Sequence, residues 1–236
     1  MSVLASVGIL ILSLLIFMLM QLSPGIFLLF SHYNKGKFSR RKAADLNLFY
    51  IVGAEIMVTM IFLCIYFTVS ALAPIQLNLD NGIIVWTIIG ALITISFLFF
   101  IFYYRKGSGT RLFISRRFAD AADSKAKAIK SRSDAFVLGY SAGIPELIFT
   151  LPLYFICSLE IMRIGTTGLD RALLILLFIM VSLVQLFIIN FQFARRRNLA
   201  EIQRSRVKNK PFIRSTVSFL YFLIAILIIT FRIILP

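Results

Sequence analysis

Six long apolar runs dominate this sequence, and each is long enough to cross a bilayer as a helix. A helix rises about 1.5 Å per residue, so about 20 apolar residues span the roughly 30 Å hydrocarbon core. Inside that core every backbone polar group needs a partner within the protein, which favours the helix. The runs cover residues 3–30, 46–73, 82–104, 136–162, 172–193 and 216–235. We therefore expect an all-α polytopic membrane protein with six transmembrane helices.

The composition supports an integral membrane protein. Hydrophobic residues make up 60% of the 236 residues, and the mean hydropathy is +0.93. A soluble domain of this size could not bury so much apolar surface. The first run has no basic leader and no small-residue cleavage site, so we expect a retained helix and not a signal peptide.

The Lys and Arg residues indicate how the chain is oriented. Segments 31–47, 105–135 and 194–215 hold five, nine and eight of the 25 cations, and they alternate with segments that hold few. This is the positive-inside pattern, so we expect these segments in the cytoplasm and both termini outside. The net charge of +15 thereby orients the chain and attracts anionic lipid headgroups. We expect no nucleic-acid partner.

The six runs divide into two sets of three. An odd number of crossings makes the second set enter the membrane in the opposite orientation, as in many carriers built from inverted repeats. We therefore expect a first three-helix half at 1–104, a basic cytoplasmic connector at 105–135 and a second three-helix half at 136–236. The connector is either an amphipathic helix on the inner leaflet or a solvated basic segment. The apolar residues that can share one face of such a helix are Ile114, Phe118, Ala121, Ala122 and Ile129.

Proline and glycine interrupt the first and the fourth run. Pro24 and Gly25 lie in the first, and Gly143 and Pro145 lie in the fourth. Proline removes a helical donor and clashes with the preceding turn, so both runs are expected to kink or break. Paired interruptions in the two halves of a chain are the best sequence indication of a transporter's central site. The alternative is that Pro and Gly are simply frequent in membrane helices.

Glu55 and Glu146 are the acidic residues that lie deepest in the predicted helices. A carboxylate at bilayer depth is costly unless protonated, paired or hydrated, so it indicates a pathway or a proton relay. We rank Glu55 first, because Gly53 and Ala54 let a neighbouring helix approach closely and bury the acid. The alternative is an ion pair with a loop cation in a hydrated crevice. The candidate pathway residues are Glu55, Glu146, Pro24, Gly25, Ser23, Gln21, Pro145, Gly143 and Asn190.

Catalytic, metal and redox chemistry find little support in the sequence. Cys64 and Cys157 lie in separate runs without a C-x-x-C motif, so we expect two small buried hydrophobic residues. His32 is the only histidine, and we expect a solvated loop residue, with a proton-linked role as the alternative. No nucleotide-binding, zinc-protease or serine-hydrolase motif occurs. We therefore expect no cofactor, no metal site and no enzymatic activity.

The Leu-Ser-Pro-Gly sequence at 22–25, the basic segment with Gly36 and the following helix with Gly53 resemble the lysine-exporter superfamily. Its amino-acid and homoserine-type exporters share the Pro-Gly in helix one. The resemblance covers helices one and two, and Gly143-Ile144-Pro145 of helix four is similar in a general way. Electron-transferring relatives place paired cysteines in helices one and four, whereas Cys64 lies in helix two. The resemblance therefore implies solute export and not redox chemistry.

We accordingly predict a secondary transporter or exporter of a small solute, coupled to a gradient, with its central site at the broken helices one and four. The alternatives are a membrane-embedded scaffold or assembly protein and a lipid-modifying membrane enzyme. The expected partners are a small solute, protons and anionic lipid headgroups, and a homo-oligomer is compatible with the sequence. We expect the protein in a prokaryotic cytoplasmic (inner) membrane.

Overall fold

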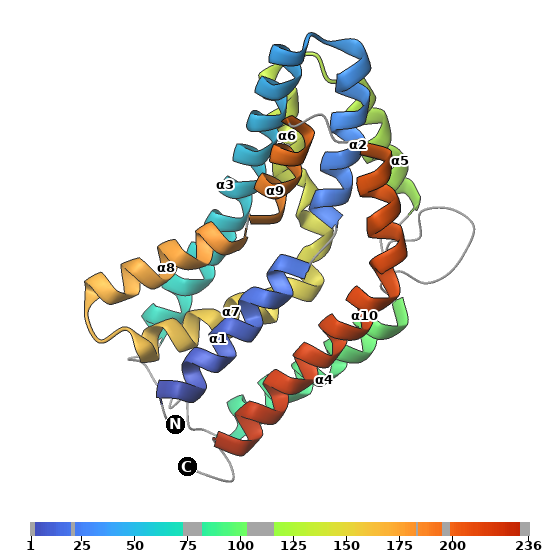
Figure 1. Ribbon diagram of the computed structural model, residues 1–236. Coiled ribbons are helices and arrows are strands. Elements are labelled where there is room, and N and C mark those ends of the chain that lie inside the picture. Colours follow the sequence, from blue (N-terminus) through green and yellow to red (C-terminus); the bar gives the residue numbers. More distant parts are fainter. Residues whose placement is uncertain are drawn as a thin grey trace.

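The protein is a bundle of α-helices (Figure 1). The computed structural model describes residues 3–19, 22–72, 82–102, 116–182, 184–194 and 199–231. The elements are α1 (Val3–Leu19), α2 (Leu22–Lys37), α3 (Arg40–Leu72), α4 (Gly82–Phe102), α5 (Arg116–Ala128), α6 (Arg132–Ala142), the short 3-10 helix η1 (Ile144–Glu146), α7 (Leu147–Ile164), α8 (Gly168–Ser182), α9 (Val184–Ala194) and α10 (Leu199–Ile229). The predicted all-α class is confirmed for this part of the chain.

Five segments of the described chain are long and apolar enough to cross a membrane. They are Val3–Asn34, Arg41–Leu72, Arg132–Ile164, Gly168–Gln192 and Pro211–Ile229. Helix α4 adds a further apolar helix, whose apolar stretch Val85–Ile101 is shorter. Figure 1 shows that α1 begins and α10 ends at one end of the molecule, whereas α5 and the turn from α2 to α3 lie at the other. The chain thus has the helices of an integral membrane protein.

Two hydrophobic cores lie one above the other along the bundle. The core nearer the start of α1, called here the terminal-end core, includes Phe17, Phe62, Phe99, Phe149, Tyr154, Phe178 and Tyr221. The core at the opposite end, called here the basic-end core, includes Phe27, Phe30, Tyr50, Ala126, Leu138 and Leu186. Helix α3 contributes to both, because its 33 residues form one uninterrupted helix. It is therefore the continuous support along which the two cores are stacked.

Helices α3 and α6 touch each other at the backbone. A β-carbon built on Gly53 would lie 2.2 Å from the carbonyl oxygen of Phe136, and one built on Gly139 would lie 2.0 Å from that of Tyr50. Only glycine leaves room for this contact. Small residues are what allow membrane helices to pack so closely. The sequence-based expectation that Gly53 permits close approach of a neighbouring helix is confirmed, and the neighbour is α6.

Helices α4 and α10 form a second pair, which hydrogen bonds hold together. The Ser96 hydroxyl donates to the Ser218 carbonyl oxygen at 2.8 Å, and the Ser218 hydroxyl donates to the Ser96 carbonyl oxygen at 2.9 Å. Helix α10 is tied to α7 as well, because the Tyr221 hydroxyl donates to the Phe149 carbonyl oxygen at 2.7 Å. Such bonds between membrane helices typically contribute about 0.6 kcal/mol each.

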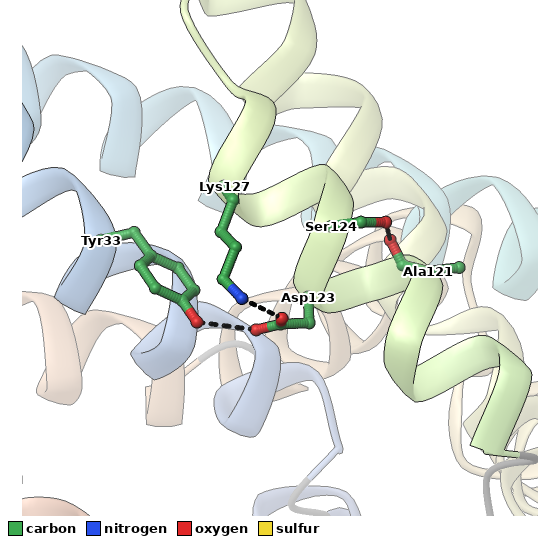
Figure 2. Close-up of polar contacts among 5 residues, drawn as sticks. All are labelled: Tyr33, Ala121, Asp123, Ser124 and Lys127. Carbon is green, nitrogen blue, oxygen red and sulfur yellow. Dashed lines mark hydrogen bonds and ion pairs between the residues drawn. The ribbon is translucent and has the colours of Figure 1, made fainter.

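Helix α5 lies against α2 and α6 at the basic end (Figure 1). Figure 2 shows the polar contact that fixes it: the Asp123 carboxylate accepts from the Tyr33 hydroxyl at 2.8 Å and from the Lys127 ammonium at 2.6 Å. The hydrogen bond from Lys127 is the main reason that the pKa of Asp123 lies below its ordinary value. On its apolar side α5 buries Ala122 and Ala126 in the basic-end core. This part of the connector is therefore helical from Arg116 to Ala128, and its buried residues pack on protein.

The predicted basic loops differ from the structure, because much of their length is helical. Helix α2 continues to Lys37, α3 begins at Arg40, and α10 begins at Leu199 and contains Pro211. Lys and Arg are good helix formers, so a helix can leave the hydrocarbon core and continue in water. For the same reason His32 is an exposed residue of α2 and not a loop residue.

The prediction for the cysteines was correct for one and wrong for the other. Cys157 is buried in the terminal-end core, whereas Cys64 is exposed on the surface of α3. In a membrane protein the surface that faces lipid is as apolar as the core. An apolar sequence context therefore indicates membrane depth but does not indicate burial.

Candidate functional site

Three helical spans change course at about the same level: two pass between described helices that run in different directions, and one passes through a short 3-10 turn (Figure 1). The first changes from α1 to α2 between Leu19 and Leu22, and the second passes from α6 through η1 to α7. The third changes direction from α8, which ends at Ser182, to α9, which begins at Val184. The second was predicted from Gly143 and Pro145. The predicted break at Pro24 and Gly25 stays a prediction, because both residues lie within α2 and the residues between Leu19 and Leu22 lie outside the described chain. The change from α8 to α9 was not predicted, because no proline or glycine occurs near it.

The interruptions open onto one cavity between the two hydrophobic cores. Its volume is about 60 Å³, which is room for a few water molecules. The lining side chains come from all three interrupted spans and from α3: Phe17, Pro24, Ala54, Met57, Val58, Gly143, Glu146, Thr150, Tyr154, Ser182, Gln185 and Leu186. A broken helix leaves backbone groups that only protein or a water-lined cavity can satisfy. The cavity therefore lies where the fold most needs polar groups.

The fourth predicted run breaks because of its local sequence. Gly143 ends α6, and the single turn of η1 follows, with the Glu146 amide donating to the Gly143 carbonyl oxygen at 3.0 Å. Pro145 fits this turn, since the start of a helix does not need the amide hydrogen that proline lacks. Helix α7 then begins at Leu147. Its positive N-terminal dipole end therefore lies next to Glu146, which is only 8% exposed.

At the first break, a side chain from another span satisfies part of the helix end. The carbonyl groups of the last turn of α1 have no intrahelical donor. Gln185 of α9 donates from Nε2 to the Met18 carbonyl oxygen. The Oε1 atom of the same side chain is buried, and no hydrogen-bond partner for it lies among the described residues. Gln185 therefore joins the first and third breaks and leaves an acceptor at the cavity.

The polar groups at the cavity include several acceptors, together with the phenol of Tyr154. Glu146 contributes a carboxylate, and Gln185 contributes Oε1. The hydroxyl hydrogens of Thr150 and Ser182 are engaged, because these groups donate to the carbonyl oxygens of Glu146 at 3.1 Å and of Ile179 at 2.8 Å. Their oxygen lone pairs remain available. The cavity is therefore suited to water or to a solute group that donates hydrogen bonds, such as an ammonium group.

The structure brings together some of the predicted pathway residues. Pro24, Gly143 and Glu146 line the cavity. Gly25 lies in α2 beside Pro24, and Pro145 lies in η1 beside Glu146. Neither of them is a lining residue, and Asn190 of α9 is not one either. Gln21 and the side chain of Ser23 lie outside the described part of the chain. The pathway role of all these residues stays a prediction.

Glu55, which ranked first from sequence, does not line the cavity. Its neighbours Ala54 and Met57 do, so the carboxylate lies on an adjacent face of α3. One of its oxygens accepts a long hydrogen bond of 3.4 Å from the Thr59 hydroxyl, and the other is buried without a hydrogen-bond partner among the described residues. Glycine at position 53 brings α6 close to α3, but on a different face from the acid.

Glu160 is a further buried acid, and it is paired with a cation. It is 1% exposed, and its Oε1 atom lies 3.2 Å from Nη1 of Arg163, one turn along α7. Two other polar residues line the cavity, Gln185 and Ser182. For an amide such as Gln185 in an apolar run, the sequence favours a hydrogen bond to another helix, and the bond to the Met18 carbonyl oxygen agrees with this. The sequence did not single out Ser182.

No group of three or more His, Cys, Asp or Glu side chains that could hold a metal ion occurs in the described part of the chain. Comparison with protein families, with curated proteins and with solved structures finds no match for this chain. The resemblance to the lysine-exporter superfamily therefore stays a prediction from residues 22–25, Gly36 and Gly53.

Proposed function

We propose that this protein is a secondary transporter or exporter of a small solute, with the cavity at the broken helices as its central site. One observation carries the proposal: the broken span of α6, η1 and α7 and the spans of α1–α2 and α8–α9 meet at one cavity, which a buried acid, Glu146, lines. Discontinuous helices that meet near the bilayer midplane form the substrate and ion sites of many carriers. We place the protein in a prokaryotic cytoplasmic membrane, with the basic segments inside and both termini outside.

The proposal includes two inverted three-helix halves, and several helix contacts support it, although the α1–α10 contact has no counterpart of similar extent between α6 and α4. The first half contains α1, α2, α3 and α4, and the corresponding elements of the second half are α6, α7, α8–α9 and α10. If the two halves are equivalent, each contact between them should have a counterpart. The counterpart of the α1–α7 contact is the α6–α2 contact, and the counterpart of the α4–α7 contact is the α10–α2 contact. All four contacts exist. The α4–α10 contact corresponds to itself. Such a pattern is expected when a two-fold axis in the membrane plane relates the halves.

Glu146 is the residue that we propose to couple transport to a proton or cation gradient. Its position at the start of α7 exposes it to any change in how α6 and α7 meet. Glu55 takes second place, because its carboxylate lies outside the cavity. The surrounding acceptors favour a solute that donates hydrogen bonds. A carboxylate that alternates between a protonated and an ionised form in such a site couples the two movements.

Flux measured in proteoliposomes tests the proposal. The panel comprises amino acids, divalent cations and lipids, each with and without a proton gradient. We expect gradient-driven flux of one solute class, a loss of about tenfold or more in Glu146→Gln, and near wild-type flux in the matched control Glu55→Gln. Both substitutions remove one titrating group and keep its size.

Each alternative has its own outcome. Equal flux in wild type and both variants would show that neither acid couples transport. An absence of flux for the whole panel would favour the scaffold, and turnover of a lipid without vectorial movement would favour the membrane enzyme.

A further inference from the structure

A groove at the basic end of the molecule lies away from the cavity. It has a volume of about 600 Å³ and lies between the turn from α2 to α3 and the turn from α5 to α6. Four cations line it, together with one carboxylate: Ser39, Arg41, Lys42, Asp45, Leu46, Lys130, Ser131 and Arg132. A volume of this order accommodates a small organic ligand. The excess of positive charge selects for an anion.

Neighbouring aromatic and acidic groups position two of the cations. The Lys42 ammonium lies 4.6 Å from the centre of the Phe38 ring. The Arg132 guanidinium lies 5.2 Å from the centre of the Phe49 ring, and its Nε atom lies 2.7 Å from Oδ2 of Asp45. Such contacts hold long side chains in defined places. Arg41 and Lys130 are exposed on either side of the groove.

The backbone amides at the helix starts beside the groove are largely engaged, so side chains must bind the anion. Ser131 and Asp134 form a reciprocal capping box at the start of α6, so that helix end is already satisfied. Ser39 accepts from the Lys42 amide near the start of α3. The anion is therefore bound chiefly by guanidinium and ammonium groups, which suit the oxygens of a phosphate ester.

The surface next to the groove indicates where such a phosphate comes from. Leu48 and Val52 on α3 are 49% and 40% exposed, and Val137 on α6 is 53% exposed. Leu48 follows Asp45 by one turn, and Val137 follows Arg132 by little more than one turn. Exposed apolar side chains at membrane depth contact acyl chains. A phosphate in this groove would thus lie directly above a surface for lipid tails.

We propose that this groove binds the phosphate headgroup of an anionic lipid, through Arg41, Lys42, Lys130 and Arg132. The site is separate from the cavity, and the proposal does not depend on transport. A lipid bound there would bridge the starts of α3 and α6, and would link the α2–α3 turn to the α5–α6 turn.

Binding to the purified full-length chain in a non-ionic detergent tests the proposal. The probe is dioctanoyl phosphatidic acid, compared with dioctanoyl phosphatidylcholine and with glycerol 3-phosphate. We expect Arg41→Gln/Lys130→Gln to weaken phosphatidic acid binding roughly 10- to 30-fold, as the loss of two cations at an anionic surface implies. The matched control Lys125→Gln/Lys208→Gln removes two exposed cations from the same end and should weaken binding less than about threefold.

A charge change of opposite sign completes the test. Asp45→Asn removes the carboxylate that partly neutralises Arg132, so we expect binding about fivefold tighter. A merely structural role for these residues predicts no gain. The proposal is overturned if both double variants weaken binding equally, if glycerol 3-phosphate binds as tightly as the lipid, if wild type does not bind, or if Asp45→Asn weakens binding. Circular dichroism shows whether each variant is folded. If Arg41→Gln/Lys130→Gln does not fold, the comparison of Asp45→Asn with wild type tests the proposal by itself.

Discussion

The α3–α6 crossing and the cavity lie within one turn of each other, yet they are packed in opposite ways. At Gly139 a β-carbon would lie 2.0 Å from a backbone oxygen of α3. At Gly143, one turn along the same segment, it would meet only the Met57 side chain, at 2.9 Å from Sδ. The first contact joins two rigid backbones, and the second involves the flexible end of a side chain beside a cavity. The molecule thus combines an inflexible crossing with an adaptable junction.

The rigid crossing allows the bundle to stay stable although it contains a cavity. Dispersion contacts are lost wherever atoms have no partner on one side, so the cavity weakens the packing around it. The crossing of α3 with α6 compensates, because backbones in contact cannot move apart without losing many contacts together. Uninterrupted α3 therefore acts as the fixed element, and we expect the broken spans to be the ones that move.

The largest effect is expected at the crossing. Gly139→Ala places a methyl group on a backbone oxygen, so α6 and α3 must separate, and we expect a loss of about 3 kcal/mol or more in the free energy of unfolding. Gly90→Ala in α4 is the control, because nothing lies within 4 Å of its β-carbon. Alanine favours a helix by about 1 kcal/mol over glycine, so the control should be neutral or stabilising. Thermal unfolding in detergent measures both, and equal stability of the two variants would show that the crossing is not rigid.

The next effect concerns the helix end at the cavity. Gln185→Leu leaves the Met18 carbonyl group without its side-chain donor, and we expect a loss of about 1–3 kcal/mol. Gln192→Leu, on the same helix but away from the cavity, should cost less. Unfolding by denaturant compares the two variants. If Gln192→Leu were the more damaging, the bond from Gln185 would not hold the break together.

Gly143→Ala should have a much smaller effect than the same substitution at Gly139. The added methyl group meets the Sδ atom of Met57, and a methionine side chain can move into the adjacent cavity. We expect a cost below about 1 kcal/mol, measured by the same thermal unfolding. A cost as large as that of Gly139→Ala would mean that the junction is as rigid as the crossing, and the contrast drawn between them would fail.

The smallest effect is expected at α5, which packs against α2 and α6. The folded structure lowers the pKa of Asp123, so this group stabilises α5 fully above its ordinary value of 3.8 and loses that effect as the pH falls through the lowered value. A spin label at Ser124→Cys in a Cys64→Ala background should therefore stay immobile at neutral pH and become mobile only below pH 3.8. Asp123→Asn should mobilise it at all pH values, whereas Asp120→Asn, exposed on the same helix, should not. If the spin label became mobile at a pH well above 3.8, groups other than Asp123 would hold α5 in place.

The sequence alone determined the helices and the interruption at Gly143 and Pro145. Apolar runs cannot lie in hydrocarbon with unsatisfied backbone groups, so they form helices, and Gly143 and Pro145 break one of them for local reasons. The concentration of Lys and Arg also identified the end at which α5 and the cationic groove lie. These properties depend on a residue and its near neighbours, and a sequence displays them directly.

Only the tertiary structure decided which faces of the helices meet. Glu55 and Glu146 have equally apolar surroundings in sequence, but only Glu146 lines the cavity, and Cys64 faces outward while Cys157 is buried. Helices α8 and α9 run in different directions although no proline or glycine lies between them (Figure 1), and Gln185 gains its partner only because α1 ends beside it. The physical reason is that lipid and core are equally apolar. In this protein hydropathy reports depth in the membrane, and only packing distinguishes a side chain that faces the cavity from one that faces lipid.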